Sequence, residues 1–210
     1  MSRSSIWVTD KNYCGDELTE YGNSWLFSPI AWDVLLDKYL NDEIQTPYGY
    51  KKNLITGGSE LFRSLNVKVN NCNDLFDRIV WELSNQQIFF VKDKRIVAEG
   101  IRKFLKTNTK HDKDNEGISP LELEHIKNRW LEIAADIENL SDDYECFIFK
   151  NTSCDDGVEN WFEKYNEETE EYEPCSLKNM DRVVAEFVHI EGKTMEFTTN
   201  LDFFKEDEDQ

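Results

Sequence analysis

The stretch RVVAEFVHIEGKTMEFT, residues 182–198, decides the fold class. Its two runs, 182–190 and 194–198, are rich in β-branched and aromatic residues, which favour strands. Glu191-Gly192 stands between them, and a glycine in so short a connection is typical of a hairpin turn. We therefore expect the two runs to pair as antiparallel strands.

Residues 28–140 carry helix signals instead. Ser28-Pro29 and Asn73 can each begin a helix, and Ser119-Pro120-Leu121-Glu122 has the pattern of a capping box ahead of a helix over 120–139. Apolar residues recur three and four positions apart in these segments, as on the buried face of a helix. Helices mainly in residues 28–140, followed by an antiparallel hairpin in the C-terminal third, predict an α+β fold.

The segments between these elements are expected to be loops. They include the polar residues up to Tyr21-Gly22, the pair Gly57-Gly58 and the acidic run 167–173. No internal repeat or Pro- and Gly-rich linker divides the chain. We therefore expect residues 1–204 to form a single domain and residues 205–210 to form an acidic, mobile tail.

Composition narrows the class of protein. The chain has 210 residues, of which 39% are hydrophobic and 13% aromatic, and this content favours a packed core over disorder. It has neither an apolar run of about 18 residues nor the apolar core of a signal peptide near its start. The five cysteines are odd in number and form no C-x-x-C pair. These features predict a soluble, cytoplasmic protein with reduced thiols.

Two motifs resemble metal sites and are incomplete. Residues 112–122 are similar to an EF-hand calcium loop, with Asp112, Asp114 and Gly117 in place, but the loop is one residue short before Glu122 and has no second copy. His189-Ile190-Glu191 matches half of the zinc-deaminase signature, and the cysteine pair that must follow is missing. Phosphate-binding loops and nucleophile motifs are also missing. We predict no catalytic residue, metal site or cofactor, and we expect millimolar calcium to leave the melting temperature unchanged.

Charge is distributed unevenly along the chain. The net formal charge is −19, made up of +1 in residues 1–110 and −20 in residues 111–210. Such asymmetry indicates either an acidic surface for a basic partner or a device for solubility alone. Direct nucleic-acid binding is disfavoured, because phosphate contacts need a surface rich in Lys and Arg. The exception is the basic segment 92–110, which we interpret as an amphipathic helix whose lysines face water or pair with the protein's own acids.

The densest mixture of acidic and aromatic side chains follows residue 154. Buried aromatics supply binding energy at protein interfaces, and surrounding charges steer the encounter. The alternative is that Trp161 and Phe162 belong to the core while the glutamates solvate a loop. The candidate partner-binding residues are Asp155, Asp156, Glu159, Trp161, Glu163, Glu167, Glu168, Glu170, Glu171, Tyr172 and Glu173.

In composition and size the chain resembles the immunity proteins that protect bacteria from toxins delivered by neighbouring cells. The resemblance implies a non-enzymatic inhibitor that neutralises a basic, nuclease-like toxin by protein–protein contact. Two other classes stay open from the sequence. One is an enzyme with an unrecognised carboxylate or calcium-assisted site, and the other is an adaptor in a regulatory complex that uses the basic helix at 96–106.

Overall fold

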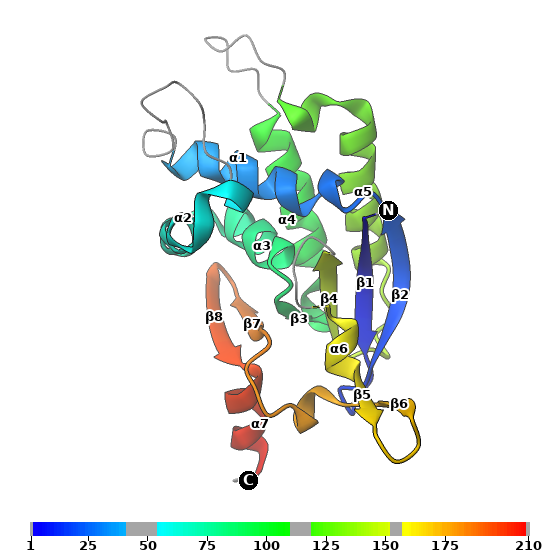
Figure 1. Ribbon diagram of the computed structural model, residues 1–210. Helices are drawn as coiled ribbons and strands as arrows, with labels where there is room; N and C mark the ends of the chain where they lie inside the picture. The colour runs from blue at the N-terminus through cyan, green and yellow to red at the C-terminus, as the bar shows by residue number, and fades with distance from the viewer. Residues whose placement is uncertain (1, 41–53, 110–118, 152–156, 209–210) are drawn as a thin grey trace.

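A six-stranded mixed sheet forms the centre of the protein in the computed structural model, which describes residues 2–40, 54–109, 119–151 and 157–208. The strand order is β2-β1-β4-β3-β7-β8 (Figure 1). All neighbours pair antiparallel except β3 and β7, which are parallel. The strands of this sheet are β1 (Arg3–Thr9), β2 (Gly15–Gly22), β3 (Ile88–Phe90), β4 (Cys146–Asn151), β7 (Glu186–Glu191) and β8 (Thr194–Thr199).

Helices cover both faces of the sheet, and more of them pack on one face than on the other. In Figure 1, α1 to α4 lie together at the top of the view, whereas α6, α7 and a separate hairpin of β5 and β6 lie at the bottom. The helices are α1 (Ser28–Leu40), α2 (Leu54–Asn70), α3 (Leu75–Ser84), α4 (Lys94–Asn108), α5 (Glu124–Glu138), α6 (Glu159–Phe162) and α7 (Asn200–Glu208). The hairpin consists of β5 (Glu163–Asn166) and β6 (Glu171–Pro174).

Alternation along the central strands divides the core in two. Successive side chains of a strand point to opposite faces of a sheet. Ile6 and Phe149 accordingly join the larger apolar cluster, which α1 to α5 complete. Trp7 and Ile148 join a smaller cluster on the other face, together with Phe162 of α6. The smaller cluster matters here because it anchors the chain just before the β5–β6 hairpin.

The α+β class and the C-terminal hairpin are confirmed. β7 pairs with β8 antiparallel, and Gly192 in the connection adopts φ 61°, a backbone conformation that favours glycine. The helix beginning at Ser28 is present as α1, and the basic segment forms α4. The expectation that its cations pair with the protein's own acids holds for Lys94 with Asp142 and Arg102 with Glu138.

Several local predictions are wrong. The predicted capping box is a 3₁₀ turn over Pro120–Glu122 whose Ser119 hydroxyl caps nothing, and α5 begins only at Glu124. The cap of α3 is Asp74 rather than Asn73. Gly57-Gly58 lies within α2, where Gly58 kinks the helix at φ 73°.

Two predicted loops contain strands. The polar segment ending at Gly22 is β2, an edge strand whose only fully buried side chain is Tyr21. The acidic run 167–173 forms the turn and second strand of the β5–β6 hairpin. Both strands consist mostly of polar residues and carry few apolar side chains, so neither shows the extended alternation by which a strand is recognised in sequence.

The remaining outcomes concern the chain as a whole. Across the described residues, no helix is both long and apolar enough to cross a bilayer. The domain over residues 1–204 and the tail 205–210 stay predictions, and α7 extends into that tail as far as Glu208. The calcium-like loop is mostly outside the described residues.

Candidate functional site

The short helix α6 fixes the base of the β5–β6 hairpin to the core. Phe162 stacks on Trp7 of β1 with ring centroids 5.7 Å apart and planes 9° from parallel. A side chain at Gly15 would place its Cβ 2.5 Å from the Phe162 ring, so glycine is needed for this approach. The backbone N–H of Cys175 then donates to the Phe162 carbonyl at 2.7 Å, closing the base of the hairpin. The hairpin therefore leaves the body of the protein from a rigid point.

Asn166 organises the turn of the hairpin. Its side-chain oxygen accepts a hydrogen bond from the backbone N–H of Glu168 at 2.9 Å, and its side-chain nitrogen donates to Glu173 Oε1 at 2.6 Å. Glu170 adopts φ 56°, a left-handed conformation that is uncommon for a non-glycine residue. The strands pair in register from Glu163 with Pro174 to Asn166 with Glu171.

A tyrosine pair is the apolar feature of the hairpin. Tyr165 and Tyr172 are directly opposite in the register, and their rings meet edge to face at 5.3 Å. Their exposed fractions are 48% and 67%, so most of this aromatic surface is open to solvent. Tyrosine offers a large contact area together with a polar hydroxyl group, the combination that is enriched at protein interfaces.

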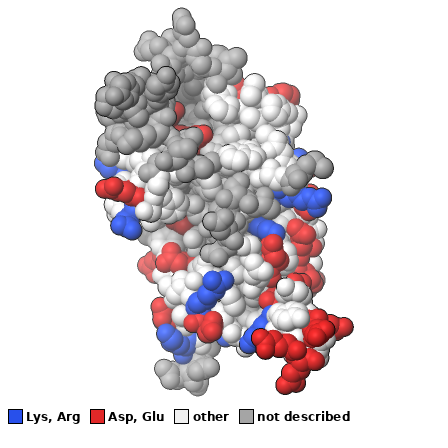
Figure 2. Space-filling view, in the orientation of Figure 1, with Lys and Arg blue, Asp and Glu red and all other residues white. Residues whose placement is uncertain are grey.

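Uncompensated negative charge surrounds this pair. Figure 2 shows Asp and Glu side chains gathered at the lower right, where Figure 1 places β5 and β6. Within the described residues, no ion pair neutralises any of these carboxylates, and Lys164 is the single basic residue between positions 163 and 174. The glutamates of this surface, which we call the acidic hairpin, are Glu163, Glu167, Glu168, Glu170, Glu171 and Glu173.

The candidate residues divide into those that the hairpin brings together and those that it does not. Tyr172 and the six glutamates are exposed on the acidic hairpin. Trp161 is 1% exposed and belongs to the smaller core cluster, which is the alternative placement that the sequence left open for it. Its role in binding a partner stays a prediction. Asp155 and Asp156 are outside the described residues.

Glu159 has a different role from the hairpin glutamates. Its carboxylate forms an ion pair with Lys150 of β4. Burial raises the pKa of the Glu159 carboxyl, but the hydrogen bond and charge of Lys150 outweigh it and hold the pKa below its usual value. Glu159 therefore fixes α6 to the sheet at the base of the hairpin.

Tyr165 is the residue that the list of candidates omitted. The signal was present, because Tyr165 and Tyr172 are placed nearly symmetrically about the acidic turn. Only the strand register shows that the two rings meet.

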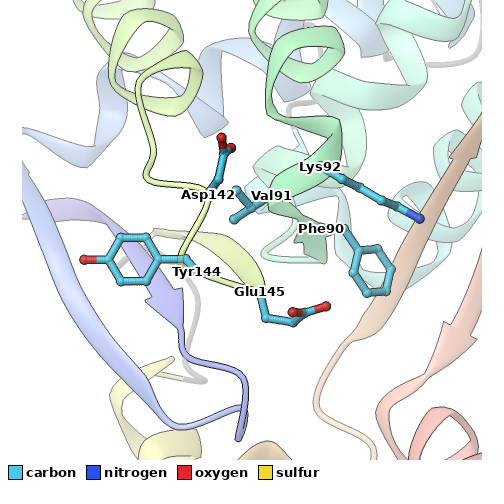
Figure 3. A pocket seen from close by; sticks show the side chains of 6 residues that line it. All are labelled: Phe90, Val91, Lys92, Asp142, Tyr144 and Glu145. Carbon is cyan, nitrogen blue, oxygen red and sulfur yellow. The ribbon is translucent and has the colours of Figure 1, made fainter.

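Away from the acidic hairpin, a hollow with a volume of about 310 Å³ lies at the end of β3 (Figure 3). Figure 3 shows that its polar side chains diverge: Tyr144 points to one side, while Lys92 points to the other. Asp142 is held by Lys94 in an ion pair. The lining therefore presents no nucleophile beside a base, which is the arrangement that covalent catalysis needs.

Histidines and cysteines contribute no cluster in the part of the chain that is described. His189 is a β7 residue packed 5.1 Å from the ring of Phe90, and His125 is on the surface of α5. Cys14, Cys72, Cys146 and Cys175 are free thiols. No group of three or more His, Cys, Asp or Glu among the described residues could hold a metal ion.

Comparisons with known proteins add no assignment. No protein-family model matches the chain, no curated protein matches it, and no solved structure matches it. The acidic hairpin is thus the feature of the structure from which a function can be argued.

Proposed function

We propose that this protein binds a basic protein partner through the acidic hairpin and blocks it, acting in the cytoplasm as an immunity protein against a toxin with nuclease activity. The observation that supports the proposal is the exposed tyrosine pair among six glutamates, none of which forms an ion pair with a cation in the part of the chain that the structure describes. Solubility alone does not call for two tyrosine rings at the tip of the same projection.

The chemistry of a nuclease explains why such a surface would inhibit one. An active cleft built to hold phosphate is lined by Lys and Arg, so a projecting acidic strand pair can occupy it in place of the nucleic acid. The tyrosine rings can stack on Arg or on apolar surface within the cleft. Inhibition of this kind needs no catalytic group in the inhibitor.

Two sets of variants separate the effect of charge on the association rate from the effect of the tyrosine rings on the dissociation rate. Replacing Glu167, Glu168, Glu170 and Glu171 with Gln should slow association with the partner, because opposite charges accelerate encounter. Replacing Tyr165 and Tyr172 with Ser should instead speed dissociation, with a loss of about 2 kcal/mol or more of affinity if the rings are anchors. Stopped-flow association and dissociation of the co-purified partner measure both effects.

A matched control removes the same number of charges elsewhere. Glu60, Glu99, Glu191 and Glu196 are exposed, and no ion pair is described for them, so their replacement with Gln should leave association nearly unchanged. Raising salt from about 0.1 M to about 1 M shortens the Debye length from about 10 Å to about 3 Å and should slow association of the wild type. If no basic protein co-purifies, or if association is insensitive to salt and to the hairpin variants, the inhibitor proposal is wrong.

A further inference from the structure

The two edges of the central sheet differ in their protection against pairing with a further strand. An edge strand exposes unpaired backbone N–H and C=O groups, and proteins block such edges with charges, prolines or bulges. β2 carries three exposed acids, Asp16, Glu17 and Glu20, and a bulge at Leu18, where its register with β1 shifts. β8 is at the opposite edge (Figure 1), has Glu196 as its one charged residue, and pairs with β7 over six residues without a shift. β8 is therefore the unprotected edge.

The turn at Gly192 determines which backbone groups of β8 point outward. The connection has two residues, so the residues that flank it form a hydrogen-bonded pair with each other, and the pattern alternates from there. The N–H and C=O groups of Met195 and Phe197 accordingly point away from β7. Arg78 of α3 supports this assignment, because it donates to the Met195 carbonyl at 3.1 Å. Within the described residues, no other segment forms a backbone hydrogen bond with Phe197.

We propose that β8 pairs antiparallel with β8 of a second copy of this chain, so that the two six-stranded sheets become continuous across a twofold axis. Two registers overlap the strands almost completely. The register centred on Glu196 would set this acid against itself, which is destabilising. The register centred on Phe197 instead sets Glu196 opposite Thr198 of the second copy, and it brings the outward backbone groups of the two Phe197 residues together. The second register is the one that we expect.

Charge favours a second copy over a foreign strand as the occupant of this edge. Two copies of net charge −19 repel each other, so they can approach closely only where acids are few, as on β8. A basic foreign strand would find more attraction at β2 or at the acidic hairpin. Phe197 is partly buried against the larger core cluster, and the Phe197 of the second copy would cover more of it. Because one strand pair buries little surface, the dimer should be weak, and it does not depend on the function proposed above.

The test is sedimentation velocity of the full-length protein from about 10 μM to about 500 μM. The wild type should form a dimer as its concentration rises, and more of it at about 1 M than at about 0.1 M salt, because salt screens the repulsion between copies. Thr198→Glu should weaken dimerisation about tenfold or more, since it sets two pairs of glutamates against each other. Adding Glu196→Lys to Thr198→Glu should restore the dimer, because each pair then consists of a lysine and a glutamate.

Thr19→Glu is the matched control, because Thr19 is a partly exposed threonine of β2, the other edge strand. It should leave dimerisation unchanged, and melting temperatures should show that the variants are folded. If Thr198→Glu does not fold, a mixture of Glu196→Cys and Thr198→Cys proteins decides, since mild oxidation should link them as a disulfide dimer that the wild type does not form. The proposal is wrong if the wild type stays monomeric throughout, if Thr19→Glu weakens the dimer as much as Thr198→Glu, or if neither the double variant nor the cysteine mixture forms the dimer.

Discussion

Glu82 of α3 is an acidic side chain held inside the protein, with 3% of its surface exposed. Burial raises the pKa of its carboxyl to about 7, the charge of Glu186 on β7 adds to the rise, and Asn70 of α2 and Arg78 of α3 oppose it. The folded state therefore holds a proton that the unfolded chain has already released between about pH 4.5 and pH 7.

The free energy of unfolding should consequently fall as the pH rises from about 4.5 to 7 and then level off, by up to about 3 kcal/mol from this group. Glu82→Gln keeps the shape without the charge and should flatten this part of the profile. Urea unfolding at several pH values measures it. An unchanged pH profile in Glu82→Gln would show that the carboxyl does not titrate in this range.

Trp161 belongs to the core, and its loss should be a loss of stability. Trp161→Ala removes a ring that is 1% exposed and should lower the free energy of unfolding by about 3–5 kcal/mol. Tyr172→Ala, on the exposed hairpin, should change it by less than about 0.5 kcal/mol. Urea unfolding followed by circular dichroism compares the two. A stable Trp161→Ala variant that loses its partner would restore the interface role expected from the sequence.

At the scale of single elements, the start of α3 is capped by the side chain of Asp74. The Asp74 side chain accepts hydrogen bonds from the backbone N–H groups of Phe76 at 3.0 Å and Asp77 at 3.4 Å. Asp74→Ala should therefore cost about 1 kcal/mol of stability, whereas Asn73→Ala should cost almost nothing. Asp74→Asn keeps the cap and removes the negative charge that lies 3.8 Å from Lys38. This variant should retain most of the stability that the cap supplies. Thermal unfolding of the three variants decides between the two caps.

Most elements with an apolar face were predictable from the sequence, and elements without one were not. The apolar spacing of α4 and the β-branched residues of β7 are strong local signals, because each element buries one face in a core. β2 is a strand only because β1 pairs with it, and β5–β6 is a hairpin only because Asn166 and the base at Phe162 hold its turn. α2 was missed although Leu61, Leu65 and Val69 follow a helical spacing, since Gly57-Gly58 suggested a loop. As a result, the contribution of α2 to the larger core cluster was not predicted.

At the scale of the whole molecule, the order of the strands in the sheet could not be predicted from local sequence patterns. Ile88 pairs with Ile148 on one side and Phe187 on the other, and all three are apolar strand residues with no feature that selects one neighbour. The parallel alignment of β3 with β7 follows from the path of the whole chain between them. Of the candidate site, the acidic side chains were predictable from composition, but the pairing of Tyr165 with Tyr172 required the register.

Net charge is the other property of the whole molecule. At −19, the compact state carries a repulsion that the expanded chain relieves. Adding sodium chloride from about 0.01 M to about 0.2 M shortens the Debye length from about 30 Å to under 10 Å and should raise the melting temperature. Scanning calorimetry measures this shift, and a melting temperature that falls with salt would indicate that attractive pairs such as Arg102 with Glu138 dominate instead.

The antiparallel pairing of β1 with β4 has a consequence for synthesis on the ribosome. Ile6 emerges well before its partner Phe149, which follows more than 140 positions later. At a translation rate of about 5–20 residues per second, roughly 7 to 30 seconds pass in which β2 is the only strand of the sheet that can pair with β1. The early hairpin exposes Ile6, Trp7 and Val8 in that interval, and the acidic residues of β2 are then its main protection against joining another nascent chain. A message truncated before β4 would release such a hairpin with no sheet to complete.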